Sequence, residues 1–194
     1  MEETRNELRR AAVQRRGGLD PATCSSWSRL IQAKTVELQQ YRTARSVAVY
    51  RAIGNEVDTG AIVDHALGNN KKVFVSKLGA EEPGVFVRIF SRGEQVQVAA
   101  ASAVDWTGAE GDGLMVVVPG VLFDCEGIRL GRGGGWYDRT LQLIGDRGRY
   151  VGLAYELQVI DRVPAQPWDQ KVDYVITESR VIDCSGQLPR GIAR

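Results

Sequence analysis

Short apolar runs, and apolar positions spaced three or four residues apart, divide most of this chain into predicted strands and helices. Short runs of mostly apolar residues bounded by polar ones favour buried strands. Such runs occur at residues 46–50, 72–75, 114–118, 150–155, 172–176 and 180–183. The run at 114–118 is continuous and rich in valine, which is typical of a central strand buried on both faces.

Two helices are predicted before the first strand. Residues 2–16 read as a helix rich in arginine and glutamate. Asp20 followed by Pro21 then starts a second helix, because this pair supplies an N-cap acceptor and a proline at the first helical position. The apolar face of the second helix consists of Trp27, Leu30, Ile31, Leu38 and Tyr41. We expect both helices to pack on the body of the protein as an N-terminal extension.

A helix separates the first two predicted strands. It begins at Asp58 or Thr59, ends at Gly68, and lies between the runs at 46–50 and 72–75. This strand–helix–strand order is a βαβ unit, which implies parallel pairing and a right-handed crossover. We therefore expect an α/β fold with an open, mostly parallel, Rossmann-like sheet flanked by helices.

Residues 79–113 have the weakest pattern of apolar and polar positions in the chain. Residues 85–89 and 95–99 have the composition of two strands, and the Ser-Arg-Gly turn at 91–93 would join them as a hairpin. A loop rich in glycine, aspartate and alanine follows and carries Trp106.

Bulk composition narrows the class of protein. The 194 residues are 43% hydrophobic and 25% charged, which predicts one globular domain over residues 1–194. The formal net charge of +1 gives no global field that would recruit nucleic acid or a membrane. No apolar run approaches the ~18 residues of a membrane helix. We expect neither nucleic acid nor a membrane as a partner.

The cysteines argue against a zinc site or a disulfide framework, and the single histidine argues against a histidine-based catalytic triad. Cys24, Cys125 and Cys184 are far apart and form no CxxC pair, so they predict reduced thiols of a cytoplasmic protein. His65 lies inside a helical pattern, and its isolation argues against a histidine-based catalytic triad.

The stretch RLGRGGGWYD at residues 129–138 is the strongest candidate for a binding site. Its glycines are Gly131, Gly133, Gly134 and Gly135. Because they lack a β-carbon, the loop can turn its N–H groups toward one point, and the predicted helix after it adds a positive dipole. Arg129 and Arg132 add two cations, so the loop predicts a phosphate cradle. Asp138 is placed to hold a Mg²⁺ ion that bridges phosphates.

From the residues alone, a second interpretation of this loop stays open. Glycine-rich turns between a strand and a helix are common, and many bind no ligand. The stretch matches neither the dinucleotide fingerprint GxGxxG nor the Walker pattern, which requires GK followed by serine or threonine.

Three further charged residues are candidates because of their positions. Glu56 follows the first strand of the βαβ unit, where ligands of open α/β sheets bind, although an isolated loop carboxylate is usually just solvated. Arg5 and Arg9 are four residues apart and share one face of the first helix. The alternative for this pair is an ordinary solvated helix.

Several motifs together resemble the 5-formyltetrahydrofolate cyclo-ligase family, also called methenyltetrahydrofolate synthetase. The strongest is VPGVLFDCEGIRLGRGGGWYDRTL at 118–141, which is similar to the family's proline-glycine, aromatic-Asp, G-x-RLG, glycine-cluster and YD signature. RNELR at 5–9 resembles the family's N-terminal opening, and NEVDT at 55–59 its substrate loop. VGLAYELQ and PWDQKVDYVITE, within 151–178, resemble its C-terminal part.

The resemblance implies an ATP- and Mg²⁺-dependent ligase that closes 5-formyltetrahydrofolate to 5,10-methenyltetrahydrofolate, on a fold similar to sugar isomerases and CoA transferases. It implies that Arg5 and Arg9 contact the nucleotide and that Arg132 is catalytic. The ATP phosphates would be wrapped by Arg129, Leu130, Gly131, Arg132, Gly133, Gly134, Gly135, Trp136 and Tyr137. Magnesium would be held by Asp138 and Asp169, and the folate by Glu56 and Arg51. We expect a monomer or a weak homodimer.

Two alternatives remain beside this interpretation. Arg51 stands where the family usually has an apolar or small residue, and residues 79–113 lack a recognisable Gly-Ile-x-Glu-Pro segment. One alternative is therefore a non-catalytic protein that binds nucleotide or folate on the same scaffold. The other is a related α/β enzyme, such as a sugar-phosphate isomerase or acyl transferase, that acts on another substrate.

Overall fold

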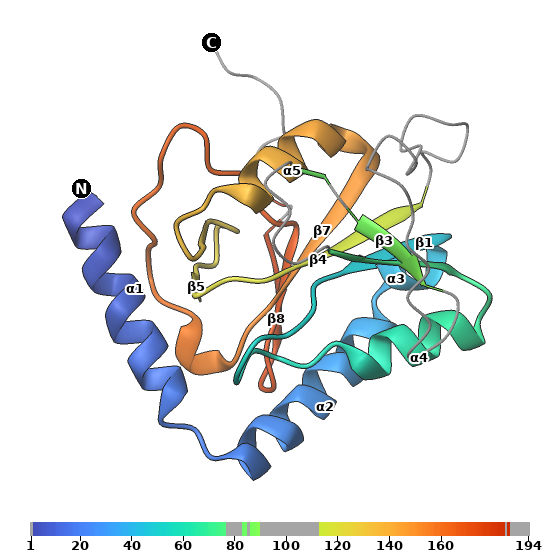
Figure 1. Ribbon diagram of the computed structural model, residues 1–194, viewed down its shortest axis with the longest axis horizontal. Coiled ribbons are helices and arrows are strands. Elements are labelled where there is room, and N and C mark those ends of the chain that lie inside the picture. The colour runs from blue at the N-terminus through green and yellow to red at the C-terminus, as the bar shows by residue number, and fades with distance from the viewer. Residues whose placement is uncertain (1, 77–82, 85, 90–112, 185, 187–194) are drawn as a thin grey trace.

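The computed structural model describes residues 2–76, 83–84, 86–89, 113–184 and 186 (Figure 1). They form an α/β fold around a seven-stranded sheet of order β3-β2-β1-β4-β7-β8-β9. The strands from β2 to β8 in this order pair in parallel, and the edge strands β3 and β9 pair antiparallel. The predicted fold class, a mostly parallel sheet flanked by helices, is confirmed.

Helices precede the first strand, and strands and helices then follow one another as far as the C-terminal edge strand. They are α1 (Glu2–Gly17), α2 (Pro21–Glu37), α3 (Gln39–Thr43), β1 (Ser46–Val49), α4 (Gly60–Gly68), β2 (Lys72–Ser76), β3 (Phe86–Ile89), β4 (Leu114–Val118), β5 (Leu122–Phe123), β6 (Arg129–Leu130), α5 (Trp136–Ile144), η2 (Gly145–Arg147), β7 (Gly148–Leu153), η3 (Glu156–Gln158), β8 (Tyr174–Ile176) and β9 (Val181–Asp183).

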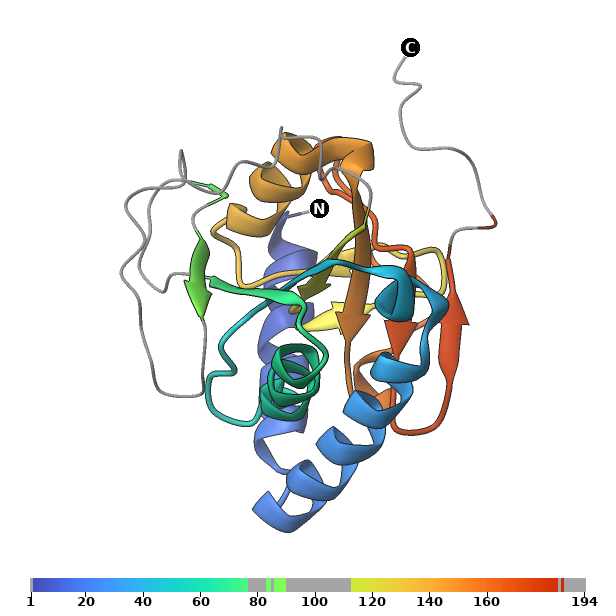
Figure 2. The ribbon, with the colours of Figure 1, turned by 90° about the vertical axis from the view of Figure 1, so that its right-hand side faces the viewer.

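Side chains on the parallel strands alternate between two cores. Val47 and Met115 belong to the core that contains residues of α2, α3 and α4, whereas Ala48 and Val116 belong to the core that contains residues of α5. Because successive strand residues point to opposite faces, this alternation places helices on both sides of the sheet. Figure 2 shows α2 and α4 on one side and α5 on the other.

The order of the strands creates a switch point between β1 and β4. After β1 the chain moves outward to β2, whereas β4 lies on the other side of β1 and leads outward to β7 and β8. The loops that leave β1 and β4 therefore diverge, and the crevice between them is where open α/β sheets bind ligands.

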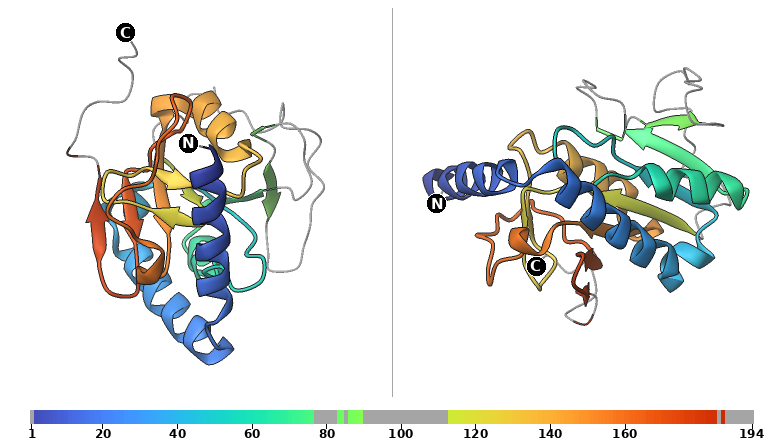
Figure 3. Two further views of the ribbon diagram at one scale, coloured as in Figure 1. Left: turned by 90° about the vertical axis from the view of Figure 1, so that its left-hand side faces the viewer. Right: turned by 90° about the horizontal axis from the view of Figure 1, so that it is seen from below.

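A small hairpin, β5–β6, presents the glycine-rich loop. Helix α1 packs against it, since Ala12 shares a small buried core with Leu122 and Leu130 (Figure 3). Asp124 closes the turn of the hairpin by accepting hydrogen bonds from the amide of Ile128 at 2.9 Å and from the amide of Val163 at 2.9 Å. The carboxylate thus ties the hairpin to the connection before β8.

The structure differs from the sequence-based expectations in several bounds. The second helix is broken at Leu38, which has an extended ψ of 139°, and the remainder forms α3. The hairpin β5–β6 was not predicted.

Strand β3 confirms a strand within the predicted 85–89 segment, and it pairs with β2, whereas the predicted second strand at 95–99 and Trp106 lie outside the described residues. Among the described residues, none of the helices has the length and apolar composition needed to cross a bilayer.

We predict that Gly152→Ala destabilises the protein. A β-carbon on Gly152 would lie 2.4 Å from the ring of Phe123, which is fully buried beneath β7. Overpacking of this kind costs about 1–3 kcal/mol in the free energy of unfolding, measurable by urea denaturation. Gly68→Ala is the control, because nothing lies within 4 Å of its β-carbon position. Equal stabilities for the two variants would contradict the proposed packing of the hairpin.

Candidate functional site

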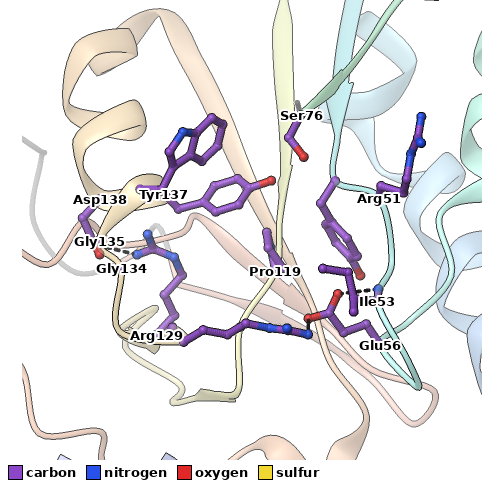
Figure 4. Close-up of a pocket in the computed structure, with 15 residues that line it drawn as sticks. Arg51, Ile53, Glu56, Ser76, Pro119, Arg129, Gly134, Gly135, Tyr137 and Asp138 are labelled. Atoms are coloured by element: carbon purple, nitrogen blue, oxygen red, sulfur yellow. Dashed lines mark hydrogen bonds and ion pairs between the residues drawn. The ribbon is translucent and has the colours of Figure 1, made fainter. Parts of the chain in front are cut away.

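A cavity of about 300 Å³ lies at the switch point between β1 and β4 (Figure 4). One wall follows β1 and includes Tyr50, Arg51 and Glu56. Ser76, the last residue of β2, and the Pro119-Gly120 turn after β4 form the floor, and residues 129–138 supply the facing wall. The crevice that the strand order implies is therefore a real pocket.

The glycine-rich loop adopts a backbone that needs some of its glycines. Gly133 has φ of +107° and Gly135 has φ of +62°, a left-handed region that other residues rarely enter. Gly135 is the N-cap of α5, so the first amides of this helix have no carbonyl one turn earlier to donate to. A β-carbon at Gly131 or Gly134 would meet open space. Those two glycines leave room beside the loop.

Arg129 and Asp138 form a largely buried ion pair in the wall of the pocket. Nη1 of Arg129 lies 2.8 Å from Oδ1 of Asp138 and donates to the carbonyl of Gln170 at 2.8 Å. The amide of Gln170 in turn donates to Oδ1 of Asp138 at 3.1 Å. The start of α5 is thus fixed to the connection before β8.

Arg5 and Asp169 form a second buried pair, which fastens α1. Nη1 and Nη2 of Arg5 donate to both carboxylate oxygens of Asp169, at 2.7 and 3.2 Å. Arg9, one turn later, donates through Nε to the carbonyl of Gly131 at 3.0 Å. The predicted shared face of Arg5 and Arg9 is confirmed, but neither they nor Asp169 belong to the described residues that line the pocket.

Arg132 and Glu56 meet across the pocket. Nη2 of Arg132 lies 2.7 Å from Oε1 of Glu56, while Oε2 accepts a hydrogen bond from the amide of Ile53 at 3.0 Å. The Glu56 side chain is 9% exposed and that of Arg132 is 54% exposed. The two candidates that the resemblance assigned to different ligands therefore contact each other in this structure.

Two tyrosines point their rings into the same region. Tyr50 donates its hydroxyl to the carbonyl of Val57 at 2.7 Å, and burial, assisted by the charge of Glu56, raises its pKa well above the ordinary value. Burial also raises the pKa of Tyr137, with Glu56 adding to the effect and the Ser76 hydroxyl opposing it. The buried Tyr137 hydroxyl forms no hydrogen bond of normal geometry with the described residues.

Sequence reasoning found most of the pocket but missed part of it. Tyr50, Ser76 and Pro119 were not predicted as site residues. Ser76 had a usable signal, because it ends the strand paired in parallel with β1 and so reaches the same edge of the sheet. The direction of the Tyr50 ring had no such signal, since strand ends alone do not reveal which face a side chain takes.

The predicted magnesium ligands fit an ion only in part. No group of three His, Cys, Asp or Glu side chains suited to a metal occurs among the described residues. A Mg²⁺ ion that accompanies phosphates commonly uses only one or two carboxylates. Asp138 fits this pattern through its second oxygen, Oδ2. Both oxygens of Asp169 are held by Arg5.

Comparisons with known proteins agree on one family. A model of the 5-formyltetrahydrofolate cyclo-ligase family matches residues 1–178. The Escherichia coli (strain K12) 5-formyltetrahydrofolate cyclo-ligase is 27% identical over 185 residues, which cover 87% of this chain and 97% of that protein. The NMR structure of Aquifex aeolicus 5,10-methenyltetrahydrofolate synthetase superposes with a TM-score of 0.76 at 28% identity, covering 98% and 96% of the two chains. A Mycoplasma pneumoniae 5,10-methenyltetrahydrofolate synthetase shares the fold, with a TM-score of 0.68 at 24% identity, covering 90% and 98%.

We predict that alanine substitution of the two pocket arginines affects stability to very different extents. Arg129→Ala lowers the free energy of unfolding by about 3–5 kcal/mol, because it leaves a mostly buried carboxylate without its cation. Arg132→Ala changes it by less than about 1 kcal/mol, because the half-exposed guanidinium lies where water can replace it and Glu56 keeps the hydrogen bond from the amide of Ile53 at 3.0 Å. Urea denaturation of both variants tests the contrast, and a large loss for Arg132→Ala would contradict it.

Proposed function

Because this chain belongs to the 5-formyltetrahydrofolate cyclo-ligase family, we propose that it converts 5-formyltetrahydrofolate to 5,10-methenyltetrahydrofolate, with ATP hydrolysed to ADP and phosphate. One observation carries the proposal beyond family membership. The pocket at the switch point combines the amides and arginines of the glycine-rich loop with the carboxylate of Glu56. Groups that suit phosphate oxygens and a carboxylate that suits the N–H groups of a folate thus line a single cavity.

The chemistry needs such a combination. A formamide oxygen is a poor nucleophile, and its carbon is a poor electrophile. Transfer of a phosphoryl group from ATP to the formyl oxygen turns that oxygen into a leaving group and releases ADP. The neighbouring folate N–H then attacks the carbon through its nitrogen, loses its proton to the phosphate or to water, and expels phosphate. Phosphoryl transfer depends mainly on positioning and on neutralising charge, so no protein nucleophile is required.

The triphosphate is proposed to lie on the glycine-rich loop. The first amides of α5 and the guanidinium of Arg132 face the cavity and suit phosphate oxygens. Arg129 also lines the cavity, and its Nε is buried without a partner in the described part of the chain, so a ligand oxygen would satisfy it. Arg5 and Arg9 lie behind the loop and are proposed to complete the nucleotide site from α1.

Asp138 and Asp169 are proposed to hold Mg²⁺. The ion would neutralise phosphate charge when bound. Asp138 offers Oδ2 directly, whereas Asp169 becomes a ligand only if Arg5 exchanges it for a phosphate oxygen. On the folate side, Glu56 would accept hydrogen bonds from the N–H groups of the pteridine. Arg51, exposed at the rim of the pocket, would meet an anionic part of the substrate.

The cytoplasm is the compartment we propose for this reaction. Cys24, Cys125 and Cys184 form no disulfide bond, and Cys184 is buried in a core, where burial raises the pKa of its thiol to about 12. Thiols that remain reduced are typical of cytoplasmic proteins.

A binding protein without turnover is the second candidate. The pairing of Asp169 with Arg5 favours it, because a carboxylate that stays with an arginine does not bind a metal ion. Incubation with ATP, Mg²⁺ and 5-formyltetrahydrofolate separates the two, since the methenyl product absorbs in the near ultraviolet. Formation of product supports the enzyme. Binding without product supports the second candidate.

In the same assay, we predict that Arg132→Ala lowers kcat at least a hundredfold. Loss of one preorganised charge contact to a transition state typically raises the barrier by ~2.7–4 kcal/mol. Arg42→Ala is the matched control, because Arg42 is an exposed arginine paired with Glu37 and does not line the pocket. Turnover of Arg132→Ala within tenfold of the unsubstituted protein would remove Arg132 from its catalytic role.

A further inference from the structure

The Tyr137 side chain has a position that binding of phosphates does not explain. Tyr137 belongs to the first turn of α5, and its amide lies beside the glycine-rich loop. Its ring, however, points across the pocket toward Ser76 at the end of β2 (Figure 4). The amide and the hydroxyl of this residue therefore serve different parts of the cavity.

The Tyr137 hydroxyl is buried and forms no hydrogen bond of normal geometry with the residues that the structure describes, although the Ser76 hydroxyl lies near enough to lower its pKa. A buried polar group in that state is unfavourable, and folded proteins rarely keep one without a reason. Tyr50, on the facing wall, shows the ordinary situation, since its hydroxyl donates to the carbonyl of Val57. The missing partner of Tyr137 points to a ligand group that arrives at this end of the pocket.

The charges around the hydroxyl indicate what that group is. Burial raises the pKa of Tyr137, the Ser76 hydroxyl opposes this effect only in part, and the nearby Glu56 carboxylate adds to it, so the phenol stays protonated near neutral pH. The Tyr137 hydroxyl is then a neutral donor, whereas the oxygens of the Glu56 carboxylate only accept. A ligand that carries N–H groups on one edge and a carbonyl oxygen on another would satisfy both residues.

We propose that the Tyr137 hydroxyl donates a hydrogen bond to a carbonyl oxygen of the reduced folate, in its formyl group or its pteridine ring. This role rests on the proposed function, and it assigns the Tyr137 side chain to the folate and its backbone amide to the phosphates. Ser76, which faces Tyr137, supplies a second hydroxyl at the same end of the pocket. Tyr137 is thereby a substrate-positioning residue.

Tyr137→Phe tests the proposal, because it separates binding from stability. In the free protein the substitution removes a hydroxyl without a partner, so the melting temperature stays the same or rises. In the complex it removes a hydrogen bond, so KM for 5-formyltetrahydrofolate rises about tenfold. The dissociation constant of Mg-ATP, measured by calorimetry, stays within about twofold, because the backbone amide is unchanged.

Tyr150→Phe is the matched control. The Tyr150 hydroxyl also lies against α5, but it donates to the carbonyls of Leu141 at 3.1 Å and Gly145 at 2.5 Å and does not line the pocket. Its loss lowers the melting temperature by roughly 2–6 °C and leaves KM for the folate unchanged.

If the unsubstituted protein forms product, the proposed function holds. Three results with the variants would then still overturn the proposed role of Tyr137. They are an unchanged folate KM in Tyr137→Phe, an equal weakening of Mg-ATP binding, and a loss of melting temperature as large as that of Tyr150→Phe. If the unsubstituted protein binds 5-formyltetrahydrofolate without turnover, the proposed function fails, and the folate dissociation constant of Tyr137→Phe still decides the role of the hydroxyl. If the unsubstituted protein does not bind the folate, both fail.

Discussion

The buried ion pair between Arg129 and Asp138 is the interaction on which the site depends. Through Arg129, Asp138 and Gln170 it joins the start of β6, the first turn of α5 and the connection before β8. Neither charge is well solvated, so the pair keeps its geometry only while both partners remain. Because the pair holds the start of α5 in place, it also sets the direction in which the glycine-rich loop before α5 presents its amides.

The parts of the fold that were predictable from sequence are those with local signals. The strand at 114–118 is apolar throughout because it is buried on both faces, and that pattern is visible without a structure. The strands β5 and β6 have two residues each, too short for any periodicity to appear. The break at Leu38 also went unseen, because the apolar spacing continues through it to Tyr41.

Contacts between residues far apart in the sequence limit how much of the site could be predicted. Arg5 and Asp169 are 164 positions apart, so nothing local shows that they pair. The resemblance placed both at the nucleotide and its metal ion. In the structure each is the counter-charge of the other, as Arg129 and Asp138 are. The protein therefore keeps these cations and carboxylates as neutral pairs, which avoids isolated charges in a partly buried region.

The contact between Arg132 and Glu56 is a third such neutral pair, and its two members are the residues proposed to bind the two substrates. Each of these groups satisfies the charge of the other across the pocket. A nucleotide that attracts the guanidinium leaves a largely buried carboxylate in need of donors, and a folate offers them. Affinity enhancement between two ligands is reciprocal by thermodynamic necessity. On the proposed roles, either substrate raises the affinity for the other, and the pocket favours being vacant or doubly occupied over holding one substrate alone.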